Sequence, residues 1–425
     1  MNIDISKIGA VGDGSYLNTA IIQKAIDDCH AAGGGRVIFS GGTYLTGKLI
    51  MKSNVTLHVT AGAVLLGSHE YDNYPETEHV KHVTSSLLPR GNNACLIFAD
   101  ECENIAITGD GIIDCSGDRY VEPHEGNVTG WPYKRIDTPT PPRAVFFTGC
   151  KNVKVEDITM INLPAGWAYW IHDCDYVTVD RIKILSDVNY PNNDGVHVNC
   201  SRNVTIANSS MTCGDDCIVV RANSISLKEN KVCERVVVTN CNLTSYASGI
   251  RIGWINDGTI RNCTFSNIVM TDTTYGISIV LPYRKPVHYN VTFPDPNVPI
   301  STDVGREETL IENLSFHNIV MDKNYSASVK IFIDANPEVR CKAIRNIYFS
   351  NLHARGPVLP HIEGRENCHL DNIWFSECSF DVTDGSEFDN WANHGAIYHP
   401  RGQHFNMHTR YVDNLHLNHT VISMR

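Results

Sequence analysis

The sequence predicts an all-β protein, a single-domain right-handed parallel β-helix with a capping helix near its N-terminus. One short block recurs four times along the chain, and related blocks follow one another at nearly the length of one helical coil. Short alternating strands with many Asn and Gly residues lie between the blocks, without sustained helical periodicity. A leucine-rich solenoid is the main alternative, and the chain lacks its Leu-x-x-Leu-x-Leu spacing.

The recurring block has an aliphatic residue, an Asn two positions later and a Phe three positions after that. It occurs as IRNCTF (260–265), IENLSF (311–316), IRNIYF (344–349) and LDNIWF (370–375). Related earlier blocks are NIAITG (104–109), NVKVED (152–157), YVTVDR (176–181) and NVTIAN (203–208). The period is about 24–27 residues, and it is longer where a loop is inserted. Because parallel strands stack about 4.8 Å apart, we expect Asn ladders at the bends and columns of Phe and Ile in the core.

The open ends of a solenoid need covering, and the segment 18–35 predicts a helix over the N-terminal end. Asn18 or Thr19 can cap this helix, and Gly33–Gly35 end it. Its apolar face is formed by Ile21, Ile22, Ala25 and Ile26. We expect one domain over 1–425, with an N-terminal cap over about 1–50, coils over about 51–383, and a C-terminal loop and last strand over 384–425.

Three segments are predicted to be long loops. The segment 115–143 holds Gly, Pro, Trp131 and Tyr133 without a strand pattern, and it could form one wall of a cleft. Similar loops are expected over 281–308 and 384–412. The last of these contains His394, His399, His404 and His408, whose spacing fits no metal motif.

Composition and charge exclude several classes of protein. Only 19% of the residues are charged and 42% are hydrophobic, which argues against a disordered chain or a coiled coil. The formal net charge of −12 argues against general binding to nucleic acid or to an anionic membrane, so we expect neither as a partner. An acidic substrate would have to meet a local cluster of Arg or Lys.

The 15 cysteines contain no CxxC pair and mostly lie in apolar strand-like runs, which predicts small buried thiols in a reducing compartment. The N-terminal stretch MNIDISKIGAVGDG has neither a basic nor an apolar leader region, and no run of 18 apolar residues occurs. We therefore expect a cytoplasmic protein, with a secreted mature form as the alternative.

Three aspartates are the strongest candidates for catalysis. Asp194 lies in NNDGVHV (192–198), and Asp215 and Asp216 follow about one coil later in CGDDCIVV. A bend at Gly214 would let both adjacent aspartates face a cleft before the buried strand begins. Three neighbouring carboxylates resist simultaneous ionisation, which provides an acid and a base at one pH and suits glycosidic cleavage. An Asp-rich bend satisfied by backbone amides, or a calcium site, would give the same pattern.

The stretches NNDGVHVNCSRNVTI and CGDDCIVV resemble the NTD and GDD blocks of glycoside hydrolase family 28, the polygalacturonase family. The opening IGAVGDGSYLNTAIIQKAIDDCHAAGGGRVIF is similar to its bacterial members, and the resemblance covers roughly 5–380. It implies a right-handed β-helix that hydrolyses galacturonan-type pectin with inversion, without a metal or organic cofactor. It further implies Asp215 as the general acid, Asp194 and Asp216 as the residues that hold the water, and Asn192 as the Asn of the NTD block.

The chain departs from the family pattern in two blocks. In YASGIRIG (246–253), Ser248 stands where the family's GHG block has His, and in YGISIV (275–280), Ser278 and Val280 stand in place of the RIK block that grips a uronate carboxylate. Arg221 and Arg251 are candidates to replace these cations, with Arg284 and Lys285 as further ones.

Two histidines and an aromatic cluster complete the candidate site. His197 lies between Val196 and Val198, so it faces outward if both valines face the core, and His172 falls one coil earlier. We expect each to be a sugar contact or a surface histidine. Trp167, Tyr169 and Trp170 either pack in the core or stack on sugars.

The leading hypothesis is an inverting glycoside hydrolase acting on α-linked pectic saccharides of galacturonate or rhamnogalacturonan type, chiefly oligosaccharides. A polysaccharide lyase or epimerase on the same fold is the second hypothesis, with Arg221 or Arg251 as candidate bases. A non-catalytic carbohydrate-binding solenoid is the third, although retention of all three aspartates argues against it. The predicted partner is a pectic oligosaccharide, and no cofactor or metal is expected.

Overall fold

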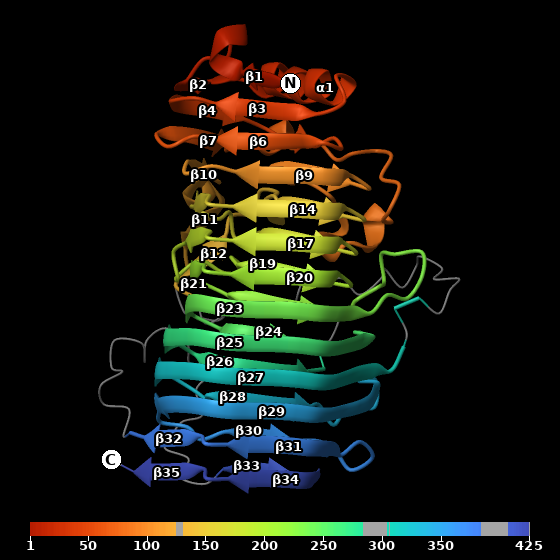
Figure 1. Cartoon of the computed structure of the whole chain (residues 1–425), viewed down its shortest axis with the longest axis vertical. Coiled ribbons are helices and arrows are strands. Elements are labelled where there is room, and N and C mark those ends of the chain that lie inside the picture. The colour runs from red at the N-terminus through yellow and green to blue at the C-terminus, as the bar shows by residue number, and fades with distance from the viewer. Residues whose placement is uncertain (125–130, 284–303, 306, 384–406, 425) are drawn as a thin grey trace.

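The chain winds into a tall stack of coils, with its N-terminal end and its C-terminal end at opposite ends of the stack (Figure 1). The computed structural model describes residues 1–124, 131–283, 304–305, 307–383 and 407–424. Nearly all the described strands pair in parallel with their counterparts on the neighbouring coils, and they form one sheet of 22 strands and one of 11. The predicted right-handed parallel β-helix is confirmed.

The larger sheet consists of two columns of strands, which share the long strands β23, β25, β27 and β29. The first column is β1 (Asn2–Asp4), β3 (Gly35–Phe39), β6 (Val55–Val59), β9 (Glu103–Thr108), β14 (Lys151–Glu156), β17 (Asp175–Asp180), β20 (Arg202–Ala207), β23 (Cys233–Ser245), β25 (Thr259–Thr273), β27 (Thr309–Asn324), β29 (Cys341–Gly356), β31 (Leu370–Ser376) and β34 (Val412–Asn418). The second also contains β2 (Asp13–Leu17), β4 (Gly42–Thr46), β7 (Ala63–Gly67), β10 (Ile112–Asp114), β15 (Thr159–Ile161), β18 (Lys183–Leu185), β21 (Ser210–Cys213), β32 (Ser379–Val382) and β35 (Val421–Met424).

The sheet of 11 strands forms the remaining face of the stack. Its strands are β5 (Leu49–Ile50), β8 (Ile97–Asp100), β13 (Arg143–Thr148), β16 (Trp167–His172), β19 (Val196–Asn199), β22 (Ile218–Arg221), β24 (Ser248–Ile252), β26 (Tyr275–Leu281), β28 (Val329–Ile333), β30 (His361–Glu363) and β33 (His408–Arg410). Because residues alternate along each strand, every second side chain of this sheet points away from the core.

The repeated block forms the side-chain ladders that the sequence predicts. Phe265, Phe316, Phe349 and Phe375 stack in one column with ring centroids 4.8–4.9 Å apart. The Asn residues of the block adopt the left-handed conformation, as at Asn313 with φ of 57°. The side chain of Asn313 donates to that of Asn262 over 3.1 Å and accepts from that of Asn346 over 3.0 Å. Each Asn thus makes the bend and joins adjacent coils.

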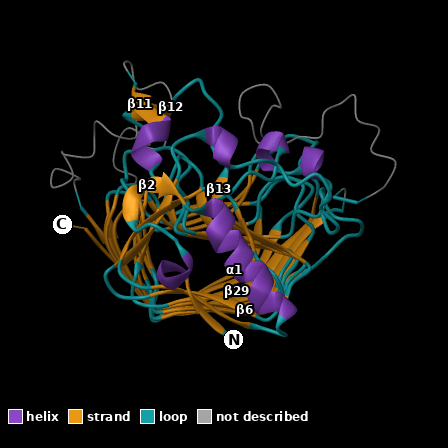
Figure 2. Ribbon diagram, turned by 90° about the horizontal axis from the view of Figure 1, so that it is seen from above, coloured by secondary structure: helices purple, strands orange, loops and turns teal. Residues whose placement is uncertain are grey.

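The predicted helix covers the N-terminal end, as the view along the stack shows (Figure 2). It is α1 (Thr19–Ala31), and it buries Ile22, Ala25, Ile26 and Cys29 while Ile21 is only half-buried. Asn18 occupies the N-cap position as predicted, but its side chain makes no capping hydrogen bond, because it instead bonds the backbone of Val11 and Tyr16. Short 3-10 turns are η1 (Ile5–Ile8), η2 (Tyr71–Asn73), η3 (Ser85–Leu87), η4 (Pro89–Gly91) and η5 (Gly117–Tyr120).

Several predicted boundaries differ from the structure. Parallel pairing begins at Asn2, well before residue 51, and three strands rather than one follow residue 407. The segment 115–143 contains η5 and the antiparallel hairpin of β11 (Val121–Pro123) and β12 (Tyr133–Arg135) instead of loop alone. Most of the loops predicted over 281–308 and 384–412 lies outside the described residues, but His408 belongs to a strand. The division into one domain stays a prediction.

All 15 cysteines are buried as free thiols, as the sequence predicts. No helix among the described residues is long and apolar enough to span a bilayer. The expected cytoplasmic location stays a prediction.

Candidate active site

A cavity of about 510 Å³ lies on the outer face of the sheet of 11 strands. The three candidate aspartates line it together with basic and aromatic side chains. The basic residues among the described lining are Arg90, Lys134, Arg135, Arg221, Arg251 and Lys330, and the aromatic ones are Trp131, Trp167, Trp170, Trp254, Tyr275 and Phe332. A concave site of this size with converging charged groups suits a saccharide unit.

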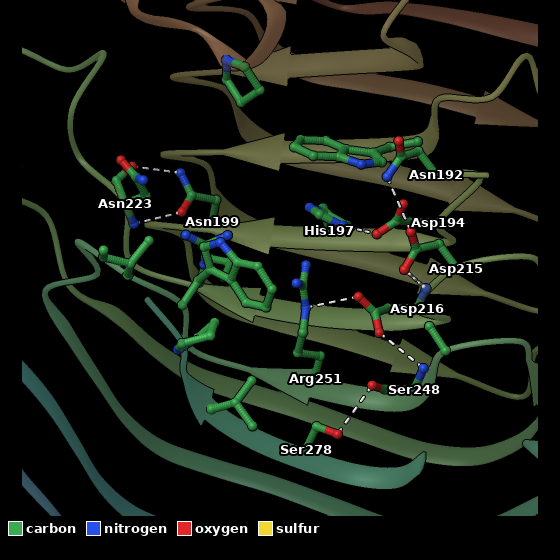
Figure 3. A pocket seen from close by; sticks show the side chains of 18 of the residues that line it. Asn192, Asp194, His197, Asn199, Asp215, Asp216, Asn223, Ser248, Arg251 and Ser278 are labelled. Atoms are coloured by element: carbon green, nitrogen blue, oxygen red, sulfur yellow. Dashed lines mark hydrogen bonds and ion pairs between the residues drawn. The ribbon is translucent and has the colours of Figure 1, made fainter. Parts of the chain in front are cut away.

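The three aspartates meet at one edge of the sheet, as predicted (Figure 3). Asp194 and Asp216 each lie two residues before paired residues of β19 and β22, Val196 and Ile218, so they occupy equivalent places on adjacent coils. Asp215 precedes Asp216 at the corner between β21 and β22, where strand alternation does not yet apply. One carboxylate oxygen from each aspartate lies within 4.8 Å of the other two.

The corner that carries Asp215 is tightly packed against the NND bend of the preceding coil. The amide of Gly214 donates to Oδ1 of Asn193 over 2.7 Å, and Trp131 donates its indole N–H to the Gly214 carbonyl over 2.7 Å. A Cβ at Gly214 would lie 2.2 Å from the carbonyl oxygen of Tyr190. Glycine is therefore required for close approach, since φ at this position is not positive. Trp131 also confirms that segment 115–143 forms a wall of the cavity.

Burial and mutual repulsion set the charge state of the aspartates. Burial, followed by the charges of Asp194 and Asp216, raises the pKa of Asp215 well above its usual range. Burial and Asp216 likewise raise the pKa of Asp194. Arg251 lies 2.8 Å from Oδ2 of Asp216 through its Nε, and the backbone amide of Ser248 donates to Oδ1 of Asp216 over 3.0 Å. The site thus places a carboxyl group of raised pKa, Asp215, next to an aspartate that pairs with an arginine, Asp216.

Asn192 and His197 position the other two aspartates. Asn192 has φ of 56° and donates its side-chain amide to Oδ2 of Asp215 over 3.2 Å, while Arg135 donates to its Oδ1. His197 lies 2.8 Å from Oδ2 of Asp194 through Nε2, and its ring stacks on Trp167 at 4.0 Å. Val196 and Val198 face the core, so His197 faces the cavity as expected, but it is only 1% exposed. Burial lowers its pKa well below the usual value, so the neutral ring donates its N–H to the carboxylate.

The prediction that His172 contacts the sugar or the solvent is wrong. The side chain is completely buried and does not line the cavity. It stacks on Trp170 at 4.6 Å and lies 2.6 Å from Nδ2 of Asn199 and 3.0 Å from Oγ of Ser226. Burial lowers its pKa to about 3, so the ring stays neutral as a packing residue beneath the cavity. Strand alternation placed it correctly on the outer face, but other residues cover it there.

Arg221 lines the cavity but already has a buried partner. Its Nε donates to Oδ2 of Asp257 over 2.6 Å, and Asp257 is fully buried. Burial raises the pKa of Asp257, while Arg221 opposes that rise. Removing either charge would leave the other buried without compensation, which is strongly unfavourable. Arg221 therefore has a structural role in addition to its place at the cavity.

Ser248 and Ser278, at which the chain departs from the family's GHG and RIK blocks, lie side by side with basic residues on the outer face of the sheet. Ser248 donates its hydroxyl to that of Ser278 over 3.2 Å. Ser278 pairs in register with Arg251 on the preceding coil and with Lys330 on the following one. Basic side chains thus flank the position at which the RIK block would place a cation. Of the remaining candidates, Arg284 and Lys285 lie outside the described residues.

Sequence reasoning missed Arg135 and Lys330. Arg135 comes from β12, which antiparallel pairing brings against the NND bend, and no motif marked it. Lys330 is far from Ser278 in the sequence, because a long segment is inserted between their coils. Its alternation with the buried residues Val329 and Ile331 was the one available signal that it faces outward.

Residues 83–233, which include all three aspartates, match the model of the family described as Glycosyl hydrolases family 28. The resemblance to this family is confirmed. Among the curated relatives, an exo-poly-alpha-D-galacturonosidase from Dickeya chrysanthemi is 31% identical over 255 residues, which cover 51% of this chain and 41% of the relative. A probable polygalacturonase from Vitis vinifera is 25% identical over 279 residues, covering 64% of this chain and 55% of the relative. The chain thus matches about half the length of these relatives.

The fold has close counterparts among solved structures. An exopolygalacturonase from Thermotoga maritima superposes with a TM-score of 0.68 at 22% identity, covering 90% of this chain and 87% of that one. Ser248, Arg251, Ser278 and Lys330 all lie beyond the segment that matches the family 28 model. The departures are therefore confined to the coils that follow the GDD corner.

Proposed function

We propose that the protein is an inverting glycoside hydrolase that cleaves α-linked pectic saccharides containing galacturonate. The three aspartates at one edge of the cavity carry this proposal, because the pKa of Asp215 is raised while Asp216 pairs with Arg251. Relatives named as galacturonan-cleaving enzymes support the substrate class. Six basic side chains among the described lining give an acidic protein a local site for an acidic sugar.

In this proposal, Asp215 protonates the glycosidic oxygen as the bond to the anomeric carbon breaks. A water molecule attacks that carbon from the opposite face. Asp194 and Asp216 hold this water, and its proton passes to Asp216, the aspartate that pairs with Arg251. His197 and Arg251 orient these two carboxylates. The oxygens lie closer together than the roughly 6.5–9.5 Å carboxyl separation usual for inverting enzymes. The stereochemical outcome therefore rests on the family resemblance and needs its own measurement.

Lys330 is proposed as a contact for a uronate carboxylate. It lines the cavity one coil beyond Ser278, with its Nζ 5.1 Å from the ring centroid of Tyr275. The site contains Arg251 as well, but Arg251 is engaged by Asp216. A charge-assisted contact contributes roughly 1.5–3 kcal/mol, so losing it would lower kcat/KM about ten- to a hundred-fold.

Short or rhamnose-containing oligosaccharides are proposed as better substrates than long unsubstituted polygalacturonan. Ser278 and Val280 cannot bind a carboxylate as the RIK residues do, and a net charge of −12 repels a long polyanion. Initial rates on polygalacturonan and on defined oligosaccharides test this preference. A clear preference for the long homopolymer would contradict it.

Product analysis tests the reaction class. Proton NMR during hydrolysis should show the new reducing end first as the inverted anomer, without an unsaturated product. An ultraviolet-absorbing product would establish a lyase, and saccharide binding without turnover would establish a binding protein. Lys330→Gln should lower kcat/KM on uronate substrates mainly through KM, whereas Lys342→Gln, at an exposed lysine on β29, should change neither constant.

A further inference from the structure

A second cluster of chemically reactive side chains lies on the same sheet, beyond the cavity. His361 and Glu363 come from β30, and His408 comes from β33 on the next coil. Ile362 between the first two is fully buried, so both flanking side chains face outward. His361 and His408 are register partners, and their rings stack 4.3 Å apart.

The donor atoms of the cluster converge on one carboxylate oxygen. Nε2 of His361 lies 2.9 Å from Oε2 of Glu363, and Nε2 of His408 lies 3.4 Å from the same oxygen. The three donor atoms all lie within 4.8 Å of one another. Arg410 approaches only the other oxygen, Oε1, at 3.8 Å. Oε2 therefore lies within reach of both imidazole nitrogens.

We propose that His361, Glu363 and His408 form a binding site for a zinc-type transition-metal dication. Two imidazole nitrogens and one carboxylate oxygen, all within 4.8 Å of one another, are a donor set that zinc accepts. With metal–ligand bonds of about 2.0–2.2 Å, tetrahedral geometry separates the donors by roughly 3.3 Å. The two measured separations bracket that value, so small side-chain rotations would complete the site.

Two arrangements fit the contacts of the cluster. In one, both imidazole nitrogens and Oε2 of Glu363 bind the same metal ion. In the other, one histidine simply donates its N–H to Glu363, and no metal binds.

The predicted consequence of metal binding is structural. The metal would join β30 to β33 and so tie the last coil to the preceding one, acting only on the folded state. β30 lies four strand spacings beyond β22, which is about 19 Å along the sheet from the aspartates. The metal would therefore stabilise the C-terminal end without taking part in hydrolysis.

Calorimetric titration with zinc chloride tests the site on full-length protein without a histidine tag, after dialysis against a chelator. We expect one saturable site per chain with a dissociation constant in the micromolar range or tighter, and a higher melting temperature with zinc. His361→Ala and His408→Ala should each weaken binding at least about ten-fold, and Glu363→Gln should also weaken it.

Two matched variants control for unrelated binding. His317→Ala removes an exposed histidine of β27 whose Nδ1 contacts Ser350, and Asp194→Asn alters the other cluster of three donors. Both should bind zinc as the wild type does. The proposal is overturned if the wild type shows no saturable binding, or if folded His361→Ala and His408→Ala bind with unchanged affinity. Circular dichroism identifies the folded variants, and His408→Asn at the more exposed position replaces any variant that does not fold.

Discussion

His197 binds only one oxygen of Asp194. Its Nε2 lies 2.8 Å from Oδ2, whereas Oδ1 is buried and makes no hydrogen bond with the described residues. The free oxygen can accept a hydrogen bond from a water or a sugar hydroxyl, while the histidine fixes the orientation of the carboxylate. His197 is thus a positioning residue for Asp194, one of the two aspartates proposed to hold the water.

Replacing His197 should separate its donor function from its packing. His197→Leu leaves a buried carboxylate without its donor, which we expect to lower kcat about ten- to a hundred-fold, with little change in KM. His197→Gln retains an N–H donor and should recover part of the rate. Steady-state kinetics on oligogalacturonides measure both constants. Equal losses in the two variants would point to packing alone.

Asp215→Asn should abolish nearly all turnover while the protein remains folded. An amide cannot deliver the proton that the leaving oxygen needs, but it has almost the same shape and can still contact Asn192. The rate and the melting temperature should be measured on the same preparation. Activity within a few-fold of the wild type would show that Asp215 is not the general acid.

The raised pKa values of Asp194 and Asp215 predict a specific pH dependence of stability. The unfolded chain loses these protons at ordinary aspartate pKa values, whereas the folded chain retains them to higher pH. Folding stability is therefore greatest below the unfolded pKa and decreases as the pH rises through the folded pKa values. Asp215→Asn cannot ionise, so its melting temperature relative to the wild type should increase as the pH rises above the ordinary aspartate pKa. A difference independent of pH would contradict the assigned shifts.

Gly214→Ala should disrupt the site more than the fold. The added Cβ would lie 2.2 Å from the Tyr190 carbonyl oxygen and 2.3 Å from Oδ1 of Asn193, which forces the GDD corner away from the NND bend. We expect a loss of about a hundred-fold or more in kcat/KM, because small displacements of reacting groups are costly. Gly258→Ala is the control, since its Cβ meets mainly the flexible end of Glu307. Similar activity losses in both variants would exclude a local effect.

Hydrolysis should not depend on a metal. The aspartates have roles as acid and base, and the guanidinium of Arg251 supplies positive charge beside them. Dialysis against a chelator should leave the rate unchanged while it lowers the melting temperature through the proposed zinc site. Activity that is lost on dialysis and restored by calcium would favour lyase chemistry.

The fold could be predicted from the sequence because the same residue pattern recurs from coil to coil. Each copy of the block carries a residue for the bend and a residue for the core, and stacking makes the same interaction on every coil, as in Phe316 between Phe265 and Phe349. A wrong assignment in one coil leaves the repeat period of the sequence block unchanged. Asn18 holds the predicted N-cap position, but local propensity cannot reveal that its side chain bonds Val11 and Tyr16 instead of the first helical N–H groups.

The helical stack and the meeting of Asp194, Asp215 and Asp216 can be predicted from the sequence, because one-coil spacing brings such residues to the same edge. The surroundings of these aspartates become visible only in the folded stack. His172 and His197 look alike in the sequence, yet one is covered and the other holds Asp194. Lys330 reaches Ser278, and His361 reaches His408, across inserted segments whose length hides the register. The spacing of neighbouring coils is a local property of the chain, whereas burial and contacts across insertions depend on the whole stack.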